Sequence, residues 1–555
     1  MYWDKLQRRL VSRRRVLVGA GAGTLGVAAA GLVGCGDDGE SNQTAPVTGA
    51  AKEPQRGGTL LSLLSSGPPH LDPVLNSSAG TVTAIMPVYS RLWKPVAKAG
   101  VDPWDWTLDP DIAVKLEQPD KTTYIYKLRQ GMKWHDRPPL NGRTLVAEDV
   151  VYSIRRALDV PQSAIKGEFA LIDSLRAIDP QTVELKAKEP FAPLNGKLGG
   201  KQMWITPREV VEQKGDVKEV AIGSGPFILD SYTPNVGLEY SRNPAYYGSP
   251  MPYADKLTQS IIADESAAES GFTTGKLDTY SVSDRRAFDR LARNMSDMQS
   301  VGTDSTGHYF YFRCDRPPAN DVRVRQAFAL TMDYEGLSKA FTSGEGRIDT
   351  VVPQAQKEWA VPPSQWGEGA KYHSKPDIAE AKKLLEAAGY GAGVEIEMYY
   401  STSFARTRQT ESFMQAMAAG AEKAGFRPKL RPEEYAVYAQ RIQGTSEYSG
   451  MLHLPAAQYP DADDYVFTYL YPGARRFASF YKDPEMEALI LKQRQEFDTE
   501  TRKKIVIEIE RRNLIQNYFM PTISFRAYNV WQKRLQNYSP RPDGPSWVAA
   551  AWIQA

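Results

Sequence analysis

The first 35 residues determine which part of this chain is available to fold. Residues 12–15 read Ser-Arg-Arg-Arg, and an apolar stretch rich in glycine and alanine follows from 16 to 33. A basic segment, an apolar run and small residues before a cut site are typical of a bacterial export signal. The adjacent Arg13 and Arg14 indicate the twin-arginine route, whose signal is read by a receptor. We therefore expect residues 1–34 to be a signal peptide that is removed, so that the fold is built from the rest of the chain.

The apolar stretch ends in Leu-Val-Gly-Cys at residues 32–35, and a polar Gly-Asp-Asp-Gly-Glu sequence comes directly after it. This order resembles a lipobox, the site at which a bacterial lipoprotein is acylated on the cysteine and cleaved just before it. Cys35 is therefore expected to carry a lipid that holds an extracytoplasmic protein on the membrane, in the periplasm or at the cell surface. The alternative is a signal anchor, because residues 16–33 are about long enough to span a membrane. The scarcity of leucine and isoleucine there favours removal.

Length and charge restrict the remaining chain further. Residues 36–56 are mostly small and polar and are expected to form a flexible linker. The chain beyond residue 56 is too long for a single core, so two or three lobes are expected. The formal charge of +2 is set by the signal, which has six basic residues and one acidic residue, so the mature chain is slightly acidic. No basic tract survives, and this excludes nucleic acid as a partner.

No group of residues has the spacing of a catalytic or metal-binding motif. The five histidines are scattered, and a Gly-x-Gly-x-x-Gly pattern at 21–26 lies inside the signal, without the strand that a nucleotide-binding loop needs before it. Residues 461–464 (Asp-Ala-Asp-Asp) lack the glycine and distal glutamate of a calcium loop, so a solvated acidic loop is expected. With Cys35 acylated, Cys314 is left alone and is expected to be a buried structural thiol. The sequence predicts no enzyme, no metal and no cofactor.

Strand-like and helix-like patterns alternate along the chain, which indicates the α/β class. Short apolar runs at 57–64, 122–128 and 182–185 predict strands. Apolar residues at helical spacing predict a helix at 147–158 and another that begins at Pro376-Asp377 and ends at Gly389. Segments 411–423 and 502–516 predict two more amphipathic helices.

Several phrases, taken in order, resemble the large extracytoplasmic solute-binding proteins of ABC importers, in family 5, which takes up oligopeptides, dipeptides and nickel. Each phrase alone is weak, but the shared order makes the match specific. The matching phrases are at 57–60, 71–73, 110–113, 126–136, 139–140, 147–153, 225–229, 242–247, 321–328 and 381–390. One departure is Arg137-Pro138, which stands where the family usually has a glycine after the aspartate. By resemblance Trp134 is expected to be a packed core residue rather than a ligand contact.

The resemblance implies a periplasmic-binding-protein-like fold of two α/β lobes that close over a ligand like a hinge, with an extra subdomain inserted in lobe I. After the signal peptide (1–34) and the linker (35–55), lobe I would comprise 56–92, 222–310 and 520–555. The inserted subdomain would be 93–221, and lobe II would be 311–519. Residues 309–313, a strongly apolar and aromatic run, are expected to be one hinge crossing.

The resemblance also implies where a ligand would bind. Peptide binders of this family hold the ligand's α-amine with an aspartate in a lobe II loop that reads Trp-x-x-Asp-Tyr, whereas residues 455–459 here read Pro-Ala-Ala-Gln-Tyr. The usual anchor is thus lost at Gln458 or moved to Asp461, whose alternative role is a helix N-cap. For the aromatic candidates the alternative is core packing, and for the serines a surface loop. Candidate ligand contacts are Ser77, Ser78, Tyr89, Trp93, Tyr399, Tyr400, Gln458, Tyr459 and Asp461.

The expected protein is thus a monomeric, lipid-anchored receptor that captures a solute by lobe closure and passes it to the ABC permease subunits in the membrane. The substitution at Gln458 leaves two ligand classes open, a free peptide and a neutral or differently charged solute such as a sugar oligomer. Two other functions remain open: a ligand sensor or docking protein on the same fold, and an exported hydrolase, which the missing catalytic motif disfavours.

Overall fold

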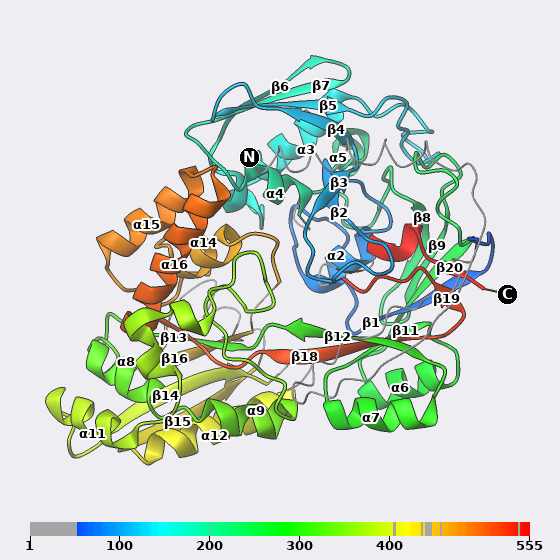
Figure 1. The fold of residues 1–555 in the computed structure, drawn as a ribbon. Coiled ribbons are helices and arrows are strands. Elements are labelled where there is room, and N and C mark those ends of the chain that lie inside the picture. The colour runs from blue at the N-terminus through cyan, green and yellow to red at the C-terminus, as the bar shows by residue number, and fades with distance from the viewer. Residues whose placement is uncertain are drawn as a thin grey trace, which may run out of the picture.

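The computed structural model describes residues 53–554 except 201–202, 403–406, 435–436, 439–446, 456–457, 475, 542–543 and 545. The predicted signal, Cys35 and most of the linker lie outside the described residues. Helices and strands alternate in three packed regions, so the α/β class is confirmed (Figure 1). In the part of the chain that is described, no helix is both long and apolar enough to cross a membrane.

Lobe I is built on a four-stranded sheet whose first strand is where the sequence predicts it. Leu60 and Leu64 of β1 point into the lobe core, and β1 pairs in parallel with β10, a strand almost 200 residues later. The helix α2 (Ala79–Ile85) adds Val82 and Ile85 to the same core. The strands, in order across the sheet, are β1 (Thr59–Leu64), β10 (Lys256–Ile261), β9 (Gly237–Arg242) and β8 (Phe227–Thr233).

The inserted subdomain is an antiparallel sheet covered by α3 (Ala147–Asp159), which confirms the helix predicted at 147–158. Trp134 is 1% exposed, and its indole N–H donates to Asp149, 3.2 Å away, so it is a core residue as predicted. Asp149 also accepts the Val146 N–H at the helix start and so caps α3. The strands, in order, are β4 (Ala113–Glu117), β5 (Thr123–Leu128), β7 (Thr182–Ala187) and β6 (Ile172–Asp179).

Lobe II is a five-stranded sheet with helices on both faces (Figure 1). Along the fully buried β13, Phe310 and Phe312 face one core, while Tyr309 and Tyr311 face the other. The strands, in order, are β15 (Phe426–Glu433), β14 (Val394–Ser401), β16 (Met451–Pro455), β13 (His308–Phe312) and β17 (Phe519–Pro521). The helices include α8 (Val322–Ala329), α9 (Tyr334–Thr342), α11 (Ile378–Ala387), α12 (Thr407–Glu422), α14 (Asp463–Leu470), α15 (Pro484–Gln495) and α16 (Thr499–Gln516).

Two strand crossings connect the lobes. The third sheet, in the order β11 (Thr279–Val282), β18 (Phe525–Trp531) and β12 (Gln299–Ser305), lies beside lobe I, and β12 and β18 continue into the lobe II sheet (Figure 1). One crossing is residues 306–307, between β12 and β13, and the other is residues 522–524, between β17 and β18.

The crossing predicted at 309–313 is therefore displaced by a few residues. Residues 308–312 form β13, which pairs with β16 and β17 inside the lobe II sheet, so the boundaries drawn at 310/311 and 519/520 cut through β13 and β17. Gly307 explains the position of the actual crossing. A Cβ atom at Gly307 would lie 1.9 Å from the carbonyl oxygen of Ile523, so only glycine lets the two crossing segments pass so closely.

Cys314 follows β13 and packs against both cores of lobe II. Its thiol donates to the Phe312 carbonyl at 3.3 Å, and burial raises its pKa to about 12. The raised pKa keeps the thiol protonated at neutral pH, and its packing agrees with a structural role, but Cys314 is partly buried rather than fully buried as predicted.

An ion pair between Asp72 and Arg156 ties lobe I to the inserted subdomain. Both side chains are at most 4% exposed, and the guanidinium makes two bonds, of 3.0 and 2.5 Å, to the two carboxylate oxygens. Asp72 also accepts the N–H groups of Val74 and Val217. Asp72, the middle residue of the Leu-Asp-Pro phrase at 71–73, therefore has a structural role.

The variant Asp72→Asn is expected to lower the free energy of unfolding by about 3–5 kcal/mol, because it leaves the Arg156 charge buried and unpaired. Urea titration followed by circular dichroism measures this value. The exposed Lys115–Glu117 pair supplies the control, and Lys115→Ala is expected to change stability by less than about 1 kcal/mol. Equal effects of the two changes would contradict the structural role of Asp72.

Candidate ligand-binding site

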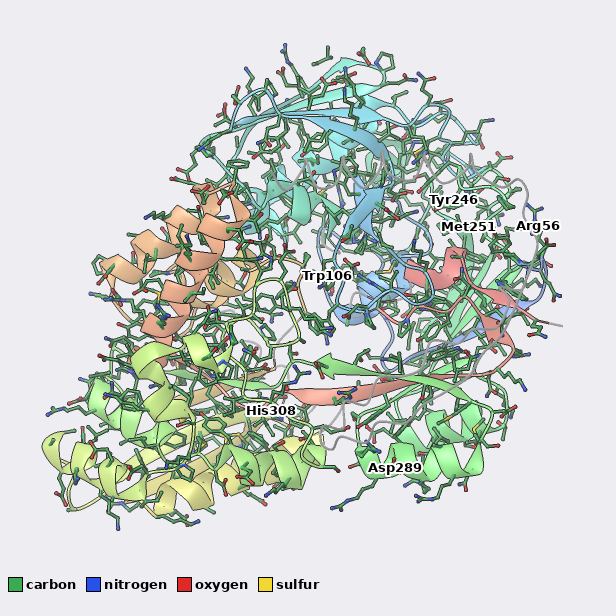
Figure 2. The ribbon with its side chains drawn as sticks, in the orientation of Figure 1. Arg56, Trp106, Tyr246, Met251, Asp289 and His308 are labelled. Carbon is green, nitrogen blue, oxygen red and sulfur yellow. The ribbon has the colours of Figure 1, made fainter. Side chains whose placement is uncertain are left out.

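The lobes meet over the crossing between β12 and β13. From the inserted subdomain, the Trp104 indole N–H donates to the Asp304 carbonyl at 2.7 Å. From lobe II, the Gln458 amide donates to the Ser305 hydroxyl at 3.3 Å. Trp106 of the inserted subdomain and His308, the first residue of β13, are labelled in Figure 2. Two distant parts of the chain thus converge on residues 304–305, next to the crossing.

A buried ion cluster, here called the latch, joins the inserted subdomain to lobe II. Lys197 of α4 (Leu194–Gly199) lies 2.6 Å from Asp464, 2.8 Å from Glu168 and 3.2 Å from Asp463. Burial by itself lowers the pKa of Lys197, but the three carboxylates outweigh it and raise this pKa, so the amine stays protonated. The latch holds α4 against the start of α14 (Figure 1).

The prediction of a solvated acidic loop at 461–464 is wrong. Asp463 and Asp464 are 0% and 4% exposed. Besides Lys197, Asp463 has the Arg494 guanidinium at 3.1 Å and the Gln493 amide at 2.6 Å. The sequence shows the acidic residues together, but their cations come from distant segments, so the pattern alone could not reveal the pairing.

Asp461 is held by Arg502, which donates to both of its carboxylate oxygens, and it also accepts the Asp463 N–H at 2.8 Å. The second of these contacts closes a local turn just before α14, whose N-cap residue is Ala462 and has no side-chain cap bond, so the alternative role of Asp461 as an N-cap is wrong. In this arrangement the charge of Asp461 is already neutralised by a bidentate arginine.

The loop that carries Gln458 is fixed by its neighbours. The Tyr465 hydroxyl accepts the N–H of Tyr459 at 2.8 Å and donates to the carbonyl of Tyr459 at 3.3 Å. Gln356 donates to the carbonyls of Tyr459 and Pro460 at 2.9 and 2.8 Å. The two residues that follow Gln458 are thus held in place by these bonds.

The remaining predicted contacts have structural roles in this arrangement. Tyr89, Trp93 and Tyr400 are at most 5% exposed and belong to three different cores. The Ser78 hydroxyl caps α2 by accepting the Thr81 N–H. Ser77 is half-buried beside it. Tyr399 donates to Glu397 at 2.6 Å. Their contact with a ligand stays a prediction, and the structure brings only the Gln458 loop to the crossing.

Sequence reasoning missed three buried polar groups near the crossing. The Asp349 oxygen Oδ2, the Tyr309 hydroxyl and the Trp106 indole N–H have no hydrogen-bond partner among the described residues, and each side chain is at most 8% exposed. Buried polar groups are nearly always satisfied, by protein, water or ligand. No motif surrounds Asp349, which stands between Ile348 and Thr350 with Arg347 nearby, so the sequence gives no signal for it.

Two surface depressions lie away from this region, both on the inserted subdomain. One is lined by residues of α3 and β6 and the other by residues of β5 and β7 and their connections. No predicted site residue lines either of them. Among the described residues, no group of three or more histidine, cysteine, aspartate and glutamate side chains lies together as a metal site requires.

Two α/β lobes joined by two crossing strands are the architecture of periplasmic binding proteins, which close by a hinge. The chain belongs to the bacterial extracellular solute-binding proteins of family 5, since the family model described as "Bacterial extracellular solute-binding proteins, family 5 Middle" matches residues 107–476. It is therefore a substrate-binding protein of an ABC transporter, for uptake of a peptide or small solute, and not an enzyme.

The chain is similar to one curated relative in sequence and to two solved structures in fold. The dipeptide-binding protein of Escherichia coli is 26% identical over 426 residues, which is 71% of this chain and 75% of the relative. Among solved structures, the binding protein DppA from Helicobacter pylori in complex with the peptide STSA has a TM-score of 0.75 and 20% identity, over 90% of this chain and 99% of that one. The binding protein AgaA from A. tumefaciens in complex with agropinic acid also has a TM-score of 0.75, with 22% identity, over 90% of this chain and 99% of that one.

The variant Lys197→Met is expected to favour separation of the lobes, because it leaves three buried carboxylates without their cation, whereas opening returns them to water. Small-angle X-ray scattering should show a larger radius of gyration than for the wild type. Lys218→Met is the control, because Lys218 is exposed and pairs only with the nearby Asp216. An unchanged radius for Lys197→Met would show that the latch does not hold the lobes together.

Proposed function

We propose that this protein captures an extracytoplasmic solute between its lobes and delivers it to the ABC permease subunits in the membrane. The observation that carries the proposal is the convergence of both lobes on one crossing, where Trp104 and Gln458 bind adjacent residues of the same strand. A solute bound there contacts both lobes only when they are closed, so it favours the closed state by its difference in affinity for the two states.

The two crossings and the latch fit such a closing motion. Rotation about residues 306–307 and 522–524 changes few backbone angles, while the latch forms or breaks as a unit on the far side of the lobes. Charges that lose water on closing but gain partners contribute little net energy. The ligand's own contacts then decide whether the closed state is populated.

The ligand class rests on the loop that carries Gln458. A neutral amide in place of a carboxylate offers no charge to an α-amine, and here it donates to Ser305. Relatives bind a peptide in one solved structure and agropinic acid in another. A peptide and a small non-peptide solute are therefore the two ligand classes to test.

Binding is tested by thermal-shift screening against peptides, oligosaccharides, amino acids and nickel complexes, followed by scattering on any pair that binds. A ligand that binds only the folded state raises the melting temperature by an amount that grows with its concentration relative to Kd. We expect one class to give a saturable shift together with a smaller radius of gyration. A shift without any change in radius would argue against capture by closure, and no shift from any class would argue against solute binding.

We further propose that the chain is exported by the twin-arginine signal at Arg13 and Arg14 and anchored by lipid on Cys35. The linker at 36–56 would then leave the lobes free to reach the permease. A single acyl chain binds membranes only marginally, so stable anchoring needs more than one chain on the modified cysteine.

Membrane fractionation tests the anchor. The variant Cys35→Ser is expected to move the protein from the membrane fraction to the soluble extracytoplasmic fraction, and Cys314→Ser, which changes the other cysteine, should leave it in the membrane. Retention of Cys35→Ser in the membrane would contradict lipid anchoring and favour a signal anchor.

A further inference from the structure

Asp349 is a fully buried carboxylate beside the crossings, and one of its oxygens has no partner among the described residues. Its other oxygen accepts the Gln354 N–H at 2.9 Å. Of the carboxylates around it, Asp304 is bound by Arg347 at 2.5 Å, and Glu510 accepts the N–H groups of Val351 and Val352 at 3.1 and 2.6 Å. Asp349 alone in this group keeps an oxygen that the described protein does not bind.

The position of Asp349 is fixed by the second crossing. Residues 347–349 run alongside 522–524: the Asp349 N–H donates to the Thr522 carbonyl at 2.8 Å, and the Ser524 N–H donates to the Arg347 carbonyl at 2.7 Å. An antiparallel bridge joins Ile348 to Ile523 between these two bonds. A carboxylate on such a rigid backbone is preorganised for a ligand.

The hydroxyl of Tyr309 accompanies Asp349. Tyr309 lies on the first crossing's strand, β13, is 0% exposed and has no hydrogen-bond partner for its hydroxyl among the described residues. Burial raises the pKa of Tyr309 well above its usual value, and the nearby Asp349 charge adds to this effect. The two unsatisfied oxygens, one on β13 and one on the segment beside the second crossing, thus lie close enough to act electrostatically on each other.

Among the described residues, the arginine that influences this carboxylate, Arg347, is already engaged. Burial raises the pKa of Asp349 to about 8, and the negative charge of Asp304 raises it further. The N–H groups of Gln354 and Gly307 and the positive charge of Arg347 lower this pKa, but burial outweighs them. Arg347 is itself paired with Asp304. An ionised carboxylate in this position needs a cation that the protein does not supply, because a buried charge is costly unless it is paired.

We propose that Asp349, together with the Tyr309 hydroxyl, binds an ammonium group of the solute and so replaces the anchor that is missing at Gln458. The inference rests on the proposed function and narrows its ligand class to solutes that carry a positive charge. A charge-assisted bond from an ammonium satisfies the open oxygen of Asp349, and a second N–H of the same group is available to Tyr309. Asp461 is already bound by Arg502, so it does not compete for this role.

The test compares two matched pools of random tripeptides, one with free amino termini and one with acetylated amino termini, and a pool of neutral malto-oligosaccharides. Each is incubated with the full-length protein, and retained molecules are identified by mass spectrometry. Wild type is expected to retain the free-amine pool only. Asp349→Asn keeps an oxygen for the Gln354 N–H and should fold, but its affinity for the retained peptides should fall by at least about tenfold.

Tyr309→Phe removes only a hydroxyl that has no described partner, so it should fold and bind the same peptides several-fold more weakly. Asp278→Asn is the matched control, because Asp278 is also fully buried with a pKa raised by burial, but its oxygens are occupied by the Leu61 N–H and Arg534. This control should keep the preference for free amines.

Proton release gives a second readout. Below pH 8 the buried Asp349 holds a proton, and an ammonium that favours the ionised form must displace it. Calorimetry near pH 7 in buffers of different ionisation enthalpy should show release of up to about one proton per ligand in wild type, and less in Asp349→Asn. Burial also raises the pKa of Glu510 to about 7 and that of Tyr465 far above this range. Both residues are present in wild type and in the variant, so the difference in proton release between the two proteins reports on Asp349.

Equal retention of free and acetylated peptides, or retention of the sugars alone, would overturn the inference while leaving solute binding intact. The same holds if Asp349→Asn folds and keeps both its affinity and its proton release. Retention of nothing by wild type would instead overturn the proposed function, and the inference with it.

Discussion

The close approach of the two crossing segments is the constraint on which the rest of this structure depends. Because Gly307 has no Cβ, the first crossing can lie against the carbonyl of Ile523 in the second. Both lobes are therefore joined through one narrow, hydrogen-bonded strip. Every element that approaches the strip, from Trp104 to Gln458, approaches both lobes at once. A binding site at this place senses the relative position of the lobes, which is what a closing receptor requires.

Buried charge has opposite roles in the strip and at the far edge of the lobes. In the latch, Lys197 is surrounded by carboxylates that satisfy it, so the cluster fixes geometry at little net gain in energy. At the strip, Asp349 keeps an oxygen without a described partner, and burial raises its pKa. In the first arrangement each charge has an opposite charge beside it within the protein. The second is the arrangement that a bound group of opposite charge completes.

Periodicity was sufficient to predict individual elements but not their pairing. The helix at 147–158 and the strand at 122–128 appear within a residue or two, since local apolar spacing alone determines them. The crossing was misplaced because residues 309–313 look equally apolar as a hinge and as the central strand β13. The acidic residues 463–464 were misread because their partner Lys197 comes from a segment more than 250 residues away. Long-range ion pairs leave no local pattern.

In the candidate site, too, local sequence patterns predicted some features, while features that depend on distant segments were missed. Resemblance located the Gln458 loop, and the structure places that loop against the crossing, but most of the aromatic candidates are core residues. Asp349 has no motif around it, and its chemistry follows only from what surrounds it: a rigid backbone, a neighbouring arginine already paired, and full burial. Because its backbone is bonded to the second crossing and its carboxylate is influenced by the N–H of Gly307 in the first, Asp349 itself is tied to both crossings. The same residue would then bind the charged group of the ligand and connect it to the segments about which the lobes close.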